Sequence, residues 1–70
     1  MILYRSTIDE ARNEAHKQYN KHLSKLTVVV FKDDNLAQKY ITVVDPSQYN
    51  QFSLRSLFDG VIYKLVGKGE

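Results

Sequence analysis

The chain has 70 residues, of which 43% are apolar and 26% are charged, and its formal charge is +2. This length builds one domain, so we expect a single unit over residues 1–70. Cysteine is absent, which excludes disulfides and thiolate chemistry, and charged residues near the start leave no apolar signal-peptide stretch, which favours a cytoplasmic protein.

Residues 2–4 are apolar and aromatic (Ile-Leu-Tyr) and predict a short first strand. Thr7 and Glu10 then have the spacing of a capping box, in which the hydroxyl and the carboxylate satisfy the first backbone N–H groups of a helix. From Ile8 to about Leu26 the apolar residues recur on one side of a helix. The pattern therefore predicts a long amphipathic helix that packs on a sheet.

Residues 27–32 (Thr-Val-Val-Val-Phe-Lys) give the strongest strand signal, because they are mostly β-branched or aromatic. Asp and Asn residues follow at 33–35 and favour a turn, since their short side chains bond to their own backbone. Residues 39–44 form the next expected strand, which makes a β-hairpin with a loop of about five residues. Pro46 ends this strand because proline cannot donate a ladder hydrogen bond.

The C-terminal part predicts a short second helix at 53–58, where Leu54, Leu57 and Phe58 have helical spacing. A last strand is expected at 61–66. The resulting order, β-α-β-β-α-β, predicts an α+β fold with the ferredoxin-like split β-α-β arrangement. The alternative omits the first strand and leaves one helix packed on a three-stranded antiparallel sheet.

Alternate residues of the predicted strands fall into two sets on opposite sides of the sheet. We expect the first set under the long helix, because it carries no charge and most of the strand aromatics. It comprises Ile2, Tyr4, Val29, Phe31, Tyr40, Thr42, Val44, Val61, Tyr63 and Leu65. The second set is mostly aliphatic and includes cations from every strand. It comprises Leu3, Arg5, Val28, Val30, Lys32, Lys39, Ile41, Val43, Ile62, Lys64 and Val66.

The aliphatic second face predicts a docking surface, because a sheet side that faces water normally carries polar residues. The expected partner-binding residues have an apolar centre and a basic rim: Val28, Val30, Lys32, Lys39, Ile41, Val43, Ile62 and Lys64. Three coverings of this face remain open. They are a second copy of the chain in a homodimer, another protein, and the chain's own residues 45–60.

Catalytic and metal-binding motifs are missing from the sequence. His16 and His22 lie on different sides of the expected helix, so they do not share a ligand site. The residues that follow Asp33 lack the glycine and the bidentate glutamate of a calcium loop. We therefore expect no cofactor and no small-molecule substrate. The leading hypothesis is a small non-enzymatic protein-binding module of the regulator or inhibitor type, a class common among phage and mobile-element products.

A nucleic-acid-binding protein is the alternative hypothesis. Lys17, Lys21 and Lys25 recur every four residues and form a ridge on the exposed side of the expected helix, and Arg12 is a further cation of the same helix. The same spacing is typical of a solvated helix surface whose cations lie near the negative end of the helix dipole. Three lysines by themselves supply little affinity for nucleic acid, so protein binding remains the leading hypothesis.

Overall fold

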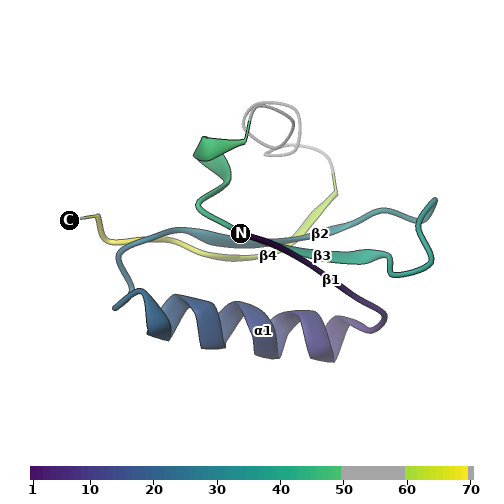
Figure 1. The fold of residues 1–70 in the computed structure, drawn as a ribbon, viewed down its shortest axis with the longest axis horizontal. Helices are drawn as coiled ribbons and strands as arrows, with labels where there is room; N and C mark the ends of the chain where they lie inside the picture. Colours follow the sequence, from purple (N-terminus) through teal and green to yellow (C-terminus); the bar gives the residue numbers. More distant parts are fainter. Residues whose placement is uncertain (50–59, 70) are drawn as a thin grey trace.

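A computed structural model describes residues 1–49 and 60–69 of the chain. It shows one helix packed on a four-stranded antiparallel sheet, which confirms the α+β class (Figure 1). The helices and strands are β1 (Ile2–Arg5), α1 (Ile8–Lys21), β2 (Val28–Lys32), β3 (Tyr40–Val44), the 3-10 turn η1 (Pro46–Gln48) and β4 (Val61–Leu65).

The strand order is β1-β3-β2-β4. Because β3 lies between β1 and β2 and is antiparallel to both, β1, α1 and β2 form the split β-α-β unit. β4 extends the sheet beyond β2, so β1 and β4 are the two edge strands. The predicted second helix at 53–58 lies outside the described residues.

α1 begins at the predicted capping residues, although the Glu10 carboxylate binds the Thr7 hydroxyl and not a backbone N–H. The Thr7 hydroxyl accepts a hydrogen bond from the Glu10 backbone N–H at 3.3 Å and donates one to the Glu10 carboxylate at 2.9 Å. Two fully buried alanines, Ala11 and Ala15, let the helix approach the sheet closely. The helix ends at Lys21, earlier than predicted, because the backbone turns left-handed two residues later.

The predicted positions of Val28 and Val30 are wrong. Cross-strand pairing places Val28 opposite Val44 and Val30 opposite Thr42, on the side of the sheet that α1 covers. Both valines are fully buried there in a cluster that includes Ala11. They belong to the core beneath the helix, which leaves them unable to serve as a docking surface.

The error comes from the hairpin register. The predicted faces place Lys32 on the same side as Lys39 and Ile41, whereas the structure places Lys32 opposite Tyr40. A shift of one residue moves every side chain of a strand to the other side of the sheet. The same inversion affects β1, where Leu3 and Arg5 lie on the α1 side and Ile2 and Tyr4 lie on the opposite side.

The side of the sheet away from α1 has its own apolar core. Val29, Phe31, Ile41 and Val43 are buried there. Partly buried apolar residues pack against this cluster: Ile2, Tyr49 and Val61. The chain that follows β3, including η1, lies on this side (Figure 1). Residues 45–49 thus supply part of the covering that one of the three alternatives expected, and residues 50–59 lie outside the described part.

β4 is irregular where it meets β2. Val28 pairs with Leu65 and Val30 with Tyr63, but the next pair joins Phe31 to Val61, so the register shifts by one residue. Such a β-bulge bends the strand and interrupts its ladder. Within the described residues, none of the helices is long and apolar enough to cross a membrane.

Candidate functional site

The predicted docking surface is not an exposed apolar face. Its four central residues are buried, Val28 and Val30 beneath α1 and Ile41 and Val43 on the opposite side. The other four members lie in two places: Lys32 and Lys39 at the hairpin, and Ile62 and Lys64 on the edge strand β4, where Lys64 pairs with Val29. The four buried residues therefore do not form the exposed apolar centre of a docking surface.

The two most exposed large apolar residues of the described chain are Leu23, at 73%, and Val66, at 63%. The remaining members of this group are exposed by 39–46%: Met1, Tyr4, Ile8, Leu36 and Ile62. Leu23 is the second residue after the end of α1, and Val66 directly follows the end of β4. The end of α1 and the end of β4 lie at the same end of the molecule, to the left in Figure 1.

The backbone at Leu23 has an unusual conformation for a leucine. The Leu23 N–H donates to the Asn20 carbonyl at 3.0 Å and the Ser24 N–H donates to the Tyr19 carbonyl at 2.9 Å, which is the Schellman pattern of a helix end. This pattern needs a left-handed residue, usually glycine, and here Leu23 has φ of 57°. A side chain in that conformation costs about 1–2 kcal/mol.

Hydrogen bonds join the residues that follow β4 to the residues that follow α1. The Lys68 N–H donates to the Ser24 carbonyl at 2.9 Å, and the Gly69 N–H donates to the Lys25 carbonyl at 3.0 Å. The Tyr19 hydroxyl donates to the Val66 carbonyl at 2.8 Å. Leu23 and Val66 therefore project from a cross-linked end of the fold rather than from a free loop.

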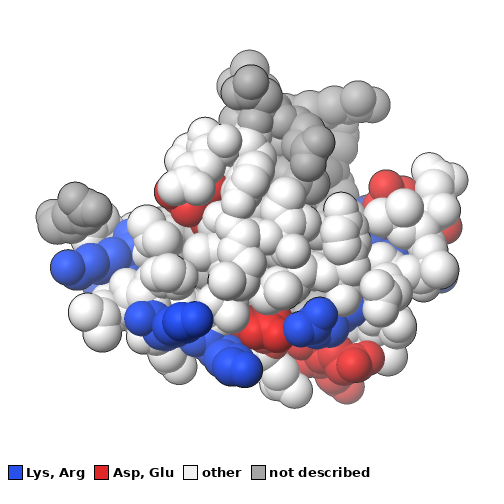
Figure 2. All heavy atoms as spheres, in the orientation of Figure 1, with Lys and Arg blue, Asp and Glu red and all other residues white. Residues whose placement is uncertain are grey.

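Lysines dominate the charge at this end, and the nearest acidic residue of the described chain is Asp45, whose N–H donates to the Thr27 carbonyl at 2.8 Å. Segments 17–26 and 60–69 contain no acidic residue, and they bring Lys68 beside Lys25. Several basic side chains gather below the end of α1 in Figure 2, and acidic ones lie nearer its beginning. We call this surface the basic end and define it by five exposed residues: Lys21, Leu23, Lys25, Val66 and Lys68.

The four cations of the nucleic-acid hypothesis do not form one patch. The Arg12 guanidinium lies 4.9 Å from the centre of the Tyr63 ring, a cation–π distance, on the side of α1 that faces β4. The Tyr63 hydroxyl is also 2.6 Å from His16 Nε2. Lys17 and Lys21 are exposed on α1, whereas Lys25 lies beyond its end.

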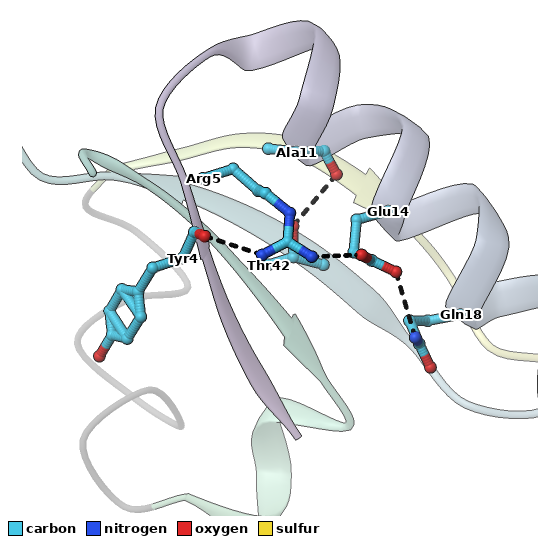
Figure 3. Close-up of polar contacts among 6 residues, drawn as sticks. All are labelled: Tyr4, Arg5, Ala11, Glu14, Gln18 and Thr42. Carbon is cyan, nitrogen blue, oxygen red and sulfur yellow. Dashed lines mark hydrogen bonds and ion pairs between the residues drawn. The ribbon is translucent and has the colours of Figure 1, made fainter.

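A polar network on the other flank of α1 is structural. Arg5 pairs with Glu14 at 2.6 Å and donates to the Tyr4 carbonyl at 2.9 Å, and Gln18 donates to Glu14 at 3.2 Å (Figure 3). The hydrogen bond from Gln18 lowers the pKa of Glu14 below its ordinary value, and Arg5 acts in the same direction against the opposing effect of burial. The network holds β1 against the helix.

The described residues include no cluster of three or more His, Asp or Glu side chains that could hold a metal ion. Comparisons of the chain with protein-family models, with curated proteins and with solved structures found no match.

Proposed function

We propose that the protein is a small non-enzymatic protein-binding module, of the regulator or inhibitor type, that docks on an acidic partner through the basic end. The observation that carries this proposal is the coincidence of the two most exposed apolar side chains with a cluster of lysines. An apolar centre with a charged rim is common interface anatomy. Because the apolar centre is small, the partner must also supply apolar contacts.

The two kinds of side chain contribute differently to binding. Full burial of Leu23 or Val66 stabilises a complex by about 1.5–3 kcal/mol each, less the part that is already covered. Exposed lysines add little to affinity, but they accelerate encounter and select against basic partners. The chemistry thus fits a short acidic segment that carries at least one large apolar side chain.

A displayed library of random peptides, selected on the full chain, tests the proposal. We expect the enriched peptides to combine Asp or Glu with a large apolar residue. Leu23→Ala should weaken the best peptide about tenfold, since it removes most of the exposed apolar side chain. Leu36→Ala is the matched control, because Leu36 is also exposed but lies in the hairpin loop. Enrichment that lacks acidic residues, or equal loss in both variants, contradicts the proposal.

Nucleic acid is the competing partner, because it would also meet Lys21, Lys25 and Lys68. Titration with single- and double-stranded DNA and RNA at low salt separates the two. The proposal predicts no binding that survives a rise in salt to about 0.15 M. Suppose instead that the chain binds DNA or RNA tightly, that this binding weakens steeply with salt, and that Leu23→Ala leaves it unchanged. The partner would then be a nucleic acid and not a protein.

A further inference from the structure

The edge strand β1 has backbone groups that point away from the sheet. The Val44 N–H donates to the Met1 carbonyl at 2.9 Å, which fixes the direction of residue 1 toward β3. Since the direction alternates along an antiparallel strand, Leu3 and Arg5 also bond to β3, and Ile2 and Tyr4 turn their N–H and C=O groups outward. Within the described chain, no strand pairs with this outer side.

The two sheet edges differ in how they are protected. β4 carries the usual protection against unwanted pairing: an outward-facing lysine at position 64, a bulge near Ile62, and a Val66 carbonyl that accepts from the Tyr19 hydroxyl. β1 has a regular register and no charged side chain before Arg5.

Within β1, Arg5 is the one charged side chain that protects the edge against unwanted pairing. Its guanidinium donates to the Tyr4 carbonyl and is held in place by Glu14 (Figure 3). A backbone carbonyl has two lone pairs, so this bond leaves room for a second donor. The Tyr4 side chain points away from α1 and is 41% exposed, so it is available for contact with another molecule.

We propose that β1 pairs antiparallel with β1 of a second copy of this chain, which joins two sheets into one of eight strands. A two-fold axis at Leu3 places Ile2 of each copy opposite Tyr4 of the other. Each such pair exchanges two hydrogen bonds between its outward-facing N–H and C=O groups, giving four in total.

A second copy suits this edge because the pairing is self-complementary. Arg5 lies opposite Met1 of the second copy, so no two charged side chains face each other, and the N-terminal ammonium group of Met1 donates a hydrogen bond to the Tyr49 hydroxyl. α1 packs mainly against the central strands β2 and β3, which leaves the outer side of β1 uncovered by the helix. The contact is small, and we expect a reversible dimer with a Kd on the order of 10–100 µM.

Sedimentation equilibrium of the full chain between about 5 and 500 µM tests the proposal. We expect the average mass to rise toward two chains for the wild type. Tyr4→Pro removes an outward-facing N–H together with the exposed tyrosine side chain, and should leave a monomer at every concentration. Lys64→Pro is the matched control on the other edge, because the pairing of its neighbours Tyr63 and Leu65 turns the Lys64 N–H outward.

Circular dichroism checks that each variant folds, and Tyr4→Lys replaces Tyr4→Pro if proline prevents folding. A wild type that stays monomeric at the highest concentration overturns the proposal. Dimerisation that both Tyr4 variants preserve, or that Lys64→Pro abolishes, also overturns it. The inference is independent of the proposed function: Leu23→Ala should leave the dimer unchanged, so the two proposals fail separately.

Discussion

Leu23→Gly should stabilise the fold. Leu23 occupies the left-handed position of the Schellman motif with φ of 57°, where a Cβ atom is crowded by the following backbone. Its side chain is 73% exposed and therefore contributes little to the core. Glycine removes the crowding and loses almost no packing.

The magnitude follows from two opposing effects. Relief of the left-handed strain gains about 1–2 kcal/mol, and the greater freedom of glycine in the unfolded chain costs about 0.5–1 kcal/mol. The net gain is about 0.5–1 kcal/mol. For a domain of this size it corresponds to a rise in Tm of about 2–8 °C.

Thermal unfolding followed by circular dichroism, together with urea titration, measures this change. Leu23→Ala is one control, because alanine keeps the Cβ atom and should not gain stability. Leu36→Gly is the other, since Leu36 has a negative φ and glycine there should lower the Tm. If Leu23→Gly lowers the Tm as much as Leu36→Gly does, the strain at the helix end is not real.

Three further variants test other parts of the structure. Because the pKa of Glu14 is lowered in the folded chain, its ionised form stabilises the fold at pH values above the ordinary pKa of 4.5. This contribution is lost as the pH falls through the folded pKa. Between about pH 7 and pH 3, urea titrations should therefore show a smaller loss of stability for Glu14→Gln than for the wild type. Gly67→Ala should destabilise the fold by about 1–3 kcal/mol in urea, because a Cβ atom there would lie 2.4 Å from the Lys25 carbonyl oxygen. Thr42→Val should cost about 1 kcal/mol in the same assay, because the buried Thr42 hydroxyl donates to a carbonyl of α1 at 3.1 Å.

The elements themselves could be predicted because their signals are local. The capping box of Thr7 and Glu10 marks the start of α1, and β-branched runs mark β2 and β3. The end of α1 could not be read, because the left-handed residue is a leucine where the usual signal is glycine. The helical spacing of apolar residues continues past Lys21 in the sequence, although the helix itself ends there.

The side of the sheet that each residue of β1 and β2 faces could not be predicted, because it depends on a single residue of register. The predicted side is correct for most of β3 and β4, whose residues on the α1 side are Tyr40, Thr42, Val44, Tyr63 and Leu65. β2 is apolar at four consecutive positions, so both of its sides suit a core and its pattern does not indicate which one faces the helix. The basic end could not be read either. Lys25 and Lys68 are far apart in the sequence, and only the hydrogen bonds between their two segments bring them together.

The most direct test of the central claim measures which aliphatic side chains face water. In a methyl-labelled sample, a gadolinium chelate in the solvent should broaden the signals of Leu23 and Val66 strongly and leave those of Val29 and Val43 sharp. Broadening of the two core valines to the extent seen for Leu23 would show an open sheet face and contradict the placement of recognition at the basic end.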